Sequence, residues 1–227
     1  PILPGRTTAY RIAEVRPQVN GIILKRLFKE GGDVKEGQQL YQIDPSVYDA
    51  TLKSAQASLT QTKSISDRYK QLVDEQAVSR QEYDTAVANR MTAEANVQTA
   101  QINVRYTKVF APISGRIGRS SVTEGALVSN GQTDAMAVIQ QLDPIYVDVT
   151  QSSAEMLKLR RDLESGQLEK AGANAAKVKL TLEDGSDYGQ DGKLEFSEVS
   201  VDQTTGSVTL RAVFPNPDHT LLPGMFV

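Results

Sequence analysis

Apolar residues between positions 46 and 105 recur at alternating spacings of four and three, which is the pattern of one face of a helix. The intervening positions are mostly Gln, Lys, Asp, Glu, Ser and Thr, and this span contains neither Gly nor Pro. The first apolar seam comprises Tyr48, Leu52, Ala55, Leu59, Thr62, Ile65 or Ser66, Tyr69 and Leu72, and the second comprises Ala86, Arg90, Ala93, Val97, Ala100 and Val104. The pattern predicts two helices, over residues 46–73 and 79–105.

The signals at the ends of these segments predict how the helices are joined. The sequence Asp44-Pro45-Ser46 favours a helix start, because Pro is tolerated in the first turn, where a backbone N–H has no helical partner. Ser79 with Glu82 three residues later forms a capping box that restarts the chain as a helix. Each arm has about 27 residues and is therefore about 40 Å long at 1.5 Å per residue. Equal arms with one short connection predict an antiparallel hairpin.

An internal repeat flanks the hairpin. Residues 15–38 align without a gap with residues 109–132, at a constant offset of 94. The identities are Val15/Val109, Gly21/Gly115, Ile23/Ile117, Glu30/Glu124, Gly31/Gly125, Val34/Val128, Gly37/Gly131 and Gln38/Gln132, and Leu40 to Ile43 also matches Met136 to Ile139. Turns with φ > 0 accept Gly without a steric penalty, and Val and Ile favour strands. Each copy therefore predicts short strands separated by Gly turns.

The two copies resemble the two halves of a biotinyl/lipoyl domain, a flattened β-sandwich, in the half-motif G-x-I followed by E-G-x-x-V-x-x-G. In acyl-carrier domains the halves are joined by a tight turn that carries the modified lysine, within an Asp-Lys-Ala or Met-Lys-Met tripeptide. Neither tripeptide occurs in this chain, and the hairpin stands between the copies instead. A carrier function is thus disfavoured, and an acyl-lysine adduct in the mass spectrum would contradict this interpretation.

Composition excludes several chemistries. The chain has no cysteine, so disulfides, thiol catalysis and thiolate metal sites are excluded, and its one histidine, His219, rules out a site with several His ligands. His219 lies in a turn-like run, where a solvated residue or a pH-sensitive group is favoured over a catalytic triad. The net charge of −3 does not favour a nucleic-acid partner, and the Gly-rich runs lack the lysine of a phosphate loop. We expect no enzyme activity, no cofactor and no metal.

Several longer segments identify the family that the whole chain resembles. They include PGRTTAYRIAEVRPQVNGIILKRLFKEG, YTKVFAPISGRIGRS, VDQTTGSVTLRAVFPNP and LLPGMFV. The chain is similar to the periplasmic adaptor (membrane fusion) proteins of RND-type tripartite multidrug efflux pumps, the MexA/AcrA type. The resemblance covers essentially all residues, although the hairpin matches more by pattern than by identity.

The resemblance implies an elongated, multi-module fold of mixed α and β class, with a helical coiled-coil hairpin inserted in a lipoyl-like β-sandwich. It assigns residues 1–13 and 144–227 to a β-barrel domain, 14–45 and 106–143 to the lipoyl-like domain, and 46–105 to the hairpin. Strand-like runs at 145–149, 178–182 and 207–214, and one helix from Ser152 to Glu164, support the barrel module. The joints near 13–14, 45–46, 105–106 and 143–144 are expected flex points.

The family function implied is a link between an inner-membrane RND drug/proton antiporter and a TolC/OprM-like outer-membrane channel, in a ring of six copies. The implied location is the periplasm, with an anchor to the inner membrane in the full-length protein. An adaptor of a type I secretion or ABC-type export system shares the sandwich-and-hairpin plan and stays open as an alternative. The chain begins on Pro1 and ends within an apparent strand, so we expect a fragment of a longer protein.

The family also implies a contact site at the hairpin tip, an Arg-x3-Leu-x6-Ser pattern that engages the outer-membrane channel. Arg68, Leu72 and Ser79 have this spacing and flank the predicted turn. Arg supplies a fork of five N–H donors for carbonyls or carboxylates, and Leu supplies an apolar knob. Purely structural roles remain open for all three: Leu72 in the seam, Ser79 as a helix cap and Arg68 as a solvated charge.

Overall fold

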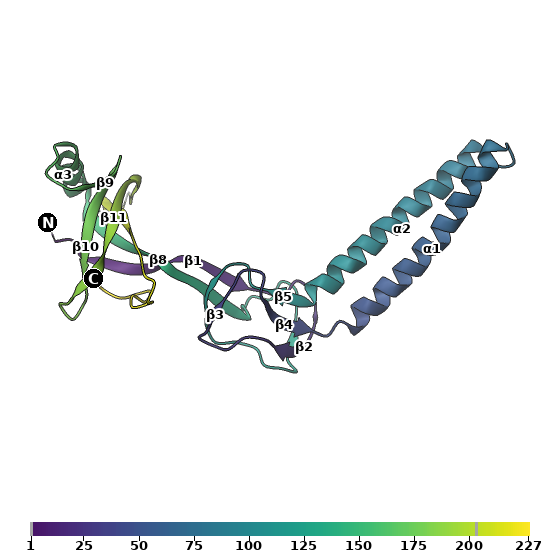
Figure 1. The fold of residues 1–227 in the computed structure, drawn as a ribbon, viewed down its shortest axis with the longest axis horizontal. Coiled ribbons are helices and arrows are strands. Elements are labelled where there is room, and N and C mark those ends of the chain that lie inside the picture. The colour runs from purple at the N-terminus through teal and green to yellow at the C-terminus, as the bar shows by residue number, and fades with distance from the viewer. Residues whose placement is uncertain (1, 203) are drawn as a thin grey trace.

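The chain is folded into three parts that lie end to end in the computed structural model (Figure 1). A β-rich part with one helix carries both chain ends, a small sandwich lies in the middle, and a long helical hairpin projects from the sandwich on the other side. The structure describes residues 2–202 and 204–227. Pro1 of the predicted first strand and Gln203 of the segment VDQTTGSVTLRAVFPNP lie outside the described residues. The mixed α and β fold with an inserted hairpin is confirmed.

The sandwich is built from short strands of both repeat copies. These strands are β2 (Gly21–Arg26), β3 (Asp33–Val34), β4 (Gln39–Ile43), β5 (Lys108–Phe110), β6 (Gly115–Ile117) and β7 (Leu127–Val128). Strands β5, β4, β2 and β7 pair in that order, and β3 pairs with β6. The buried core comprises Val15, Val19, Ile23, Phe28, Val34, Leu40, Tyr41, Ile43, Val109, Ala111, Ile117, Val128, Met136, Ala137 and Ile139.

The two repeat copies exchange strands within this sandwich. Gly21 of the first copy pairs with Val128 of the second, and Val34 of the first copy pairs with Gly115 of the second. The offset of 94 that aligns the copies converts one of these pairs into the other. The sandwich is therefore a pseudo-symmetric pair of interlocked halves, and neither half can complete its strand pairing alone.

The glycine turns obey the same symmetry. Gly31 and Gly125 have φ values of 73° and 87°, in the left-handed region that Gly adopts without steric cost. The N–H of Gly31 donates to the carbonyl of Ile117 at 3.0 Å, and the N–H of Gly125 donates to the carbonyl of Ile23 at 2.7 Å. Each turn thus hydrogen-bonds to the opposite copy, and the positive φ of the turn explains why both copies have Gly at this position of the repeat.

The β-rich part consists of β1 (Gly5–Val15), β8 (Ala137–Ser152), β9 (Lys170–Gly172), β10 (Ala175–Thr181), β11 (Asp187–Val201) and β12 (Ser207–Phe214), together with α3 (Ser153–Glu164). The strands pair in the order β1, β8, β12, β11, β10, β9. The C-terminal segment covers the free edge of β1, because the N–H of Gly5 donates to the carbonyl of Val227 at 2.8 Å. Leu159 and Leu163 of α3 are buried in the core of this part.

One long two-stranded ladder joins the β-rich part to the sandwich. Strand β8 runs unbroken for 16 residues and pairs with β1 from Gly5↔Val149 to Val15↔Ala137. The expected flex point at 143–144 therefore lies inside a continuous strand, and the one at 13–14 lies inside β1. The ladder is regular at 13–14, where Ala13 pairs with Ile139 and Glu14 with Val138, but residues 142–144 of β8 have no paired residue in β1. The register shifts at this place, because Ala9 pairs with Ile145 and Arg11 pairs with Gln141, so the expected joint at 143–144 coincides with a bulge in the ladder.

The hairpin is formed by α1 (Ser46–Asp74) and α2 (Arg80–Tyr106), which agree with the predicted arms to within about two residues. All predicted seam positions are buried or half-buried, which confirms the helical periodicity. The seam is thin: Ser66 is the buried residue of α1, and α2 buries Ala86, Ala93, Val97 and Ala100. No helix among the described residues is long and apolar enough to cross a membrane.

Two polar details of the hairpin differ from a simple apolar seam. Pro45 occupies the N-cap position of α1 and not its first turn, and the Asp44 carboxylate accepts a hydrogen bond from the N–H of Ser46 at 3.0 Å. Within the seam, Arg90 is half-buried, and its guanidinium lies 3.2 Å from the Glu94 carboxylate and 3.9 Å from that of Asp67. Arg90 occupies a seam position between the two helices, and these two carboxylates balance its positive charge there.

Candidate partner-binding tip of the hairpin

The connection between α1 and α2 is a tight turn closed by backbone hydrogen bonds. The N–H of Gln76 donates to the carbonyl of Val73 at 3.1 Å, and the N–H of Ala77 donates to the carbonyl of Leu72 at 2.8 Å. This pair of bonds is a Schellman motif, which satisfies carbonyls that have no partner within the helix. Gln76 takes the left-handed position of the motif, with φ of 57°. The tip is thus a defined structure and not an open loop.

The start of α2 is fixed by the predicted capping box. The N–H of Glu82 donates to the Ser79 hydroxyl at 3.1 Å, and the N–H of Ser79 donates to the Glu82 carboxylate at 2.7 Å. The backbone N–H of Ser79, and then its hydroxyl, hold the pKa of the Glu82 carboxyl below its ordinary value of 4.5. Glu82 is therefore charged at neutral pH and favours the helix N-terminus, where the helix dipole is positive.

The structure places the three predicted contact residues around this turn. Arg68 is exposed on α1, six residues before the helix ends, and has no ion-pair partner among the described residues. Leu72 is half-buried in the last turn of α1, and Ser79 is the exposed N-cap of α2. No direct hydrogen bond joins any two of the three in the described part of the chain. The three side chains therefore lie at the same end of the hairpin and contribute separately to its surface.

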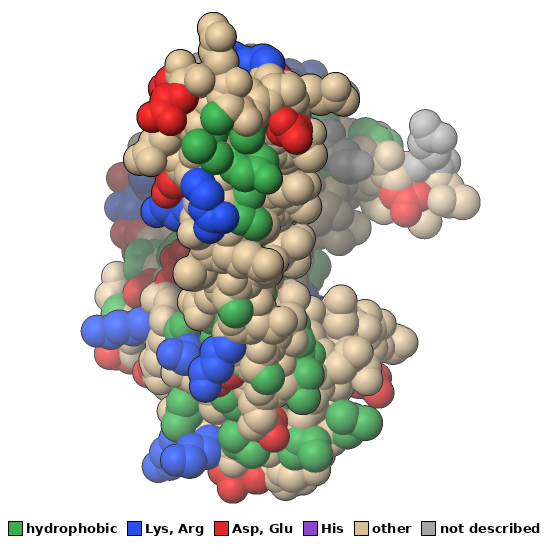
Figure 2. All heavy atoms as spheres, turned by 90° about the vertical axis from the view of Figure 1, so that its right-hand side faces the viewer, with side chains coloured by type: hydrophobic (Ala, Val, Ile, Leu, Met, Phe, Trp, Pro, Cys, Tyr) green, Lys and Arg blue, Asp and Glu red, His purple; other side chains and the backbone are tan. Residues whose placement is uncertain are grey.

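The tip surface combines a small apolar area with charged residues of both signs. Figure 2 looks onto the hairpin end of the molecule, where a group of hydrophobic side chains near the top is bordered by acidic and basic ones. Ala77 is exposed, and Leu72 and Val78 are half-buried. Arg80 lies 3.6 Å from Asp84 and its guanidinium stands 5.8 Å from the Tyr83 ring. An apolar centre with a polar rim is the composition of protein–protein contact surfaces.

The described side chains show no arrangement for metal or triad chemistry. No group of three or more His, Asp or Glu residues in residues 2–202 and 204–227 is placed to hold a metal ion. His219 has φ of 52° in the loop after β12, and its Nδ1 lies 3.4 Å from a guanidinium nitrogen of Arg116. The histidine therefore lies against a cation of the sandwich, and none of the described carboxylates is hydrogen-bonded to its ring in the manner of a triad.

Gln76 is the tip residue that the sequence did not reveal. The left-handed position at a helix C-terminus is usually Gly or Asn, and the segment 74–78 contains neither. Without a Gly or Asn in this segment, the sequence predicts only a polar turn and not a left-handed residue. The cost of a left-handed non-Gly residue is about 1 kcal/mol, and the motif is kept because both neighbouring helices hold its ends in place.

Gln76→Gly is expected to stabilise the chain by about 0.5–1 kcal/mol, because Gly relieves the left-handed strain but gains freedom in the unfolded state. Chemical denaturation followed by helical circular dichroism measures this change. Gln71→Gly is the matched control: Gln71 is also exposed but has helical geometry, so it should lose about 1 kcal/mol. Equal losses from both substitutions would show that Gln76 does not adopt the left-handed conformation.

Comparisons with known proteins agree with this architecture. The profile of the RND MFP barrel-sandwich hybrid domain matches residues 11–140, and that of the RND MFP β-barrel domain matches residues 144–227. The antibiotic efflux pump periplasmic linker protein ArpA of Pseudomonas putida is 79% identical over 225 residues, which cover 99% of this chain and 61% of that protein. The multidrug resistance protein MexA of Pseudomonas aeruginosa is 70% identical, over 99% of this chain and 59% of that protein.

A solved structure supports the same assignment. The crystal structure of a MacA-MexA chimeric protein, which contains the Pseudomonas aeruginosa MexA α-hairpin domain, superposes with a TM-score of 0.78 at 32% identity, over 99% of this chain and 78% of that chain. The present chain spans about three-fifths of the length of the curated relatives that it matches. Because the first profile spans the sandwich with its inserted hairpin and the second follows it over residues 144–227, the chain belongs to the RND family of membrane fusion proteins.

Proposed function

We propose that this protein is a periplasmic adaptor that links an inner-membrane RND drug/proton antiporter to an outer-membrane channel in a multidrug efflux pump. The observation that carries the proposal is the hairpin, whose structured tip stands about 40 Å from the sandwich. The names of the relatives support it, since ArpA is an antibiotic efflux pump periplasmic linker and MexA a multidrug resistance protein. We place the protein in the periplasm, anchored to the inner membrane.

The proposed division of labour follows the three parts of the chain. Residues 1–13 and 144–227 form a barrel domain directed to the transporter, residues 14–45 and 106–143 a lipoyl-like domain, and residues 46–105 the arm directed to the channel. Strands β1 and β8 both run from the first part into the second, and the bulge in their ladder at residues 142–144 marks where this two-stranded connection bends. The adaptor performs no covalent chemistry; it acts by contacting the open and closed states of its partners with different affinity.

At the tip, we assign the channel contact to Arg68, Leu72 and Ser79. Arg68 is exposed and without an ion-pair partner among the described residues, so its donors are available to a carboxylate or carbonyl of the channel. Leu72 contributes its outer half to the apolar centre of the tip. The Ser79 hydroxyl accepts the cap hydrogen bond from the N–H of Glu82 and lies exposed at the start of α2, where a partner can contact it.

We further propose that six copies assemble side by side. The buried residues of the α1–α2 seam are Ser, Ala and one Val, which bury little apolar area per turn. At about 25 cal/mol per Å² such a seam leaves an isolated helix pair marginally stable. Neighbouring hairpins that pack against each other would supply the missing burial.

Co-purification tests the proposal against an adaptor of a type I secretion or ABC-type export system. The full-length protein, isolated from cells after mild crosslinking, is expected to bring with it a proton-driven RND transporter and an outer-membrane channel, which mass spectrometry identifies. Recovery of an ATP-binding transporter in place of the RND transporter would assign the chain to the other class of exporter.

A further inference from the structure

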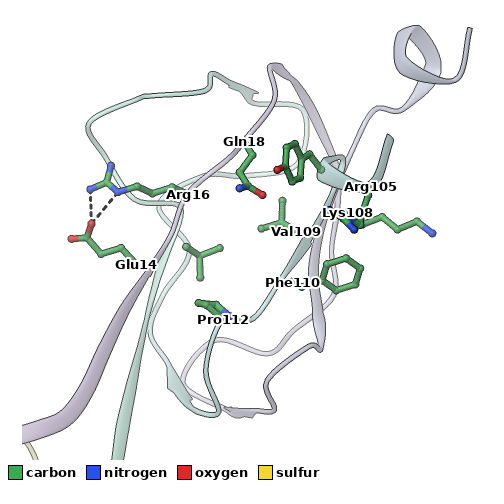
Figure 3. A pocket seen from close by; sticks show the side chains of 10 residues that line it. Glu14, Arg16, Gln18, Arg105, Lys108, Val109, Phe110 and Pro112 are labelled. Carbon is green, nitrogen blue, oxygen red and sulfur yellow. Dashed lines mark hydrogen bonds and ion pairs between the residues drawn. The ribbon is translucent and has the colours of Figure 1, made fainter. Parts of the chain in front are cut away.

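A cavity of about 370 Å³ lies at the base of the hairpin, where three segments of the chain meet (Figure 3). Val15, at the end of β1, contributes one wall, and Tyr106, in the last turn of α2, contributes another. Val109 and Phe110 of β5 and the following Pro112 complete the lining. The volume falls within the range of small-molecule sites, about 300–1,000 Å³.

The floor of the cavity is apolar. Val15 and Val109 belong to the sandwich core and are only 2% and 8% exposed, so they close the bottom of the cavity, and the apolar surface open to a ligand comes from Tyr106, Phe110 and Pro112. The Phe110 ring is 42% exposed at the edge of this base, which is unusual for a Phe in a strand. An exposed aromatic ring beside a closed apolar floor offers contact area to the hydrophobic body of a ligand.

The charges at the two rims are not equivalent. On one rim Arg16 is already occupied, because it pairs with Glu14 and donates to the carbonyl of Gln132 at 2.8 Å (Figure 3). On the other rim Arg105 and Lys108 are exposed, and neither has an ion-pair partner among the residues that the structure describes. The uncompensated charge at the mouth is therefore positive and is confined to one side.

We propose that this cavity binds an amphipathic organic anion, with an aromatic or aliphatic body against Tyr106, Phe110 and Pro112 and its acidic group beside Arg105 and Lys108. Apolar contact supplies the bulk of the affinity, and the two cations select for negative charge. Such a ligand would touch both the last turn of α2 and the end of β1. The site is independent of the channel contact at the tip, so its failure would leave the proposed adaptor function unaffected.

The fluorescent anion anilinonaphthalenesulfonate is a suitable probe, and the uncharged phenylnaphthylamine is its neutral counterpart. Titration into the 227-residue chain is expected to show saturable binding of the anion. The double charge reversal Arg105→Glu with Lys108→Glu should weaken this binding about tenfold or more, and should leave binding of the neutral probe within about twofold. Circular dichroism confirms that each variant is folded.

The matched control is Arg160→Glu with Lys63→Glu, which makes the same change in net charge at exposed helical positions outside the cavity. It should change the affinity for the anion less than about twofold, because exposed charges beyond a Debye length are screened. Phe110→Ala, which removes the apolar edge without altering charge, should weaken both probes. Equal loss in both double variants, or unchanged binding of the anion in the Arg105/Lys108 variant, would overturn the proposal.

Discussion

Arg68→Glu is expected to remove most of the pump-dependent drug resistance of cells while leaving the protein folded and at its normal level. Arg68 is exposed and its charge has no ion-pair partner in the described residues, so its reversal costs the fold little. In a closed contact with the channel, the reversed charge would lose its hydrogen bonds and meet like charge, at a cost of about 2 kcal/mol or more. Drug susceptibility in cells that lack the native adaptor measures the effect.

Lys53→Glu is the control for this substitution. Lys53 is also an exposed cation on α1, but it lies 15 residues, or about 22 Å, closer to the base of the hairpin. It should retain resistance close to that of the unmodified protein. If both variants keep resistance at normal expression, Arg68 has no part in channel contact.

Leu72 requires a different control, because it is half-buried and contributes to the seam as well as to the tip. Leu72→Ala should cost about 1–2 kcal/mol of stability, less than a fully buried Leu, and should also reduce resistance. Leu59→Ala removes a half-buried seam residue in the middle of α1 and should cost the same stability with resistance maintained. Equal loss of resistance in the two variants would assign Leu72 a structural role only.

Asn216→Ala is expected to have the largest effect on stability, about 3 kcal/mol. Asn216 is completely buried, and its amide group donates to the carbonyls of Leu142 at 2.9 Å and Leu221 at 2.8 Å. Its side-chain oxygen accepts from the N–H of Leu221 at 3.1 Å. Truncation leaves three buried backbone groups without these partners, at about 1–3 kcal/mol for each group that finds no substitute. The midpoint of denaturant unfolding measures the loss.

Asn174→Ala is the control for Asn216. Asn174 is exposed just before β10, and its substitution should stay within about 0.5 kcal/mol. Asn216→Asp refines the test, because a carboxylate oxygen in place of the amide N–H₂ would face two carbonyls and should destabilise at least as strongly as Ala. A loss below about 1 kcal/mol for Asn216→Ala would show that the loop after β12 is not anchored through this side chain.

Local patterns account for the parts of the fold that could be predicted. The seams of the hairpin follow from helical spacing alone, and the capping box of Ser79 and Glu82 needs only three residues of context. The repeat predicted short strands and Gly turns in both copies, and Val15, Ile23 and Val34 and their counterparts are buried in the same way, whereas the exchange of strands between the copies was not predicted. In each case the residues that determine the structure carry the signal themselves.

The features that escaped prediction depend on partners distant in sequence. Strands β1 and β8 each continue from one module into the other and pair on both sides of a bulge at 142–144, and no local pattern marks this arrangement. Asn216 lies in a turn-like run, and its burial depends on Leu142, which is 74 residues away. Gln76 adopts a glycine-like conformation because the helices on either side fix the turn. The tip residues were found through family resemblance, and their spacing alone carries no signal of a partner.

The orientation of the adaptor between two membranes is the central claim, and site-directed crosslinking in cells tests it most directly. The chain has no cysteine, so a single introduced one is the only reactive thiol within these 227 residues. In the full-length protein, Ala77→Cys at the exposed tip is expected to capture an outer-membrane channel, and Glu183→Cys in the turn between β10 and β11 is not. Capture of the channel from Glu183→Cys and of the inner-membrane transporter from Ala77→Cys would contradict the account.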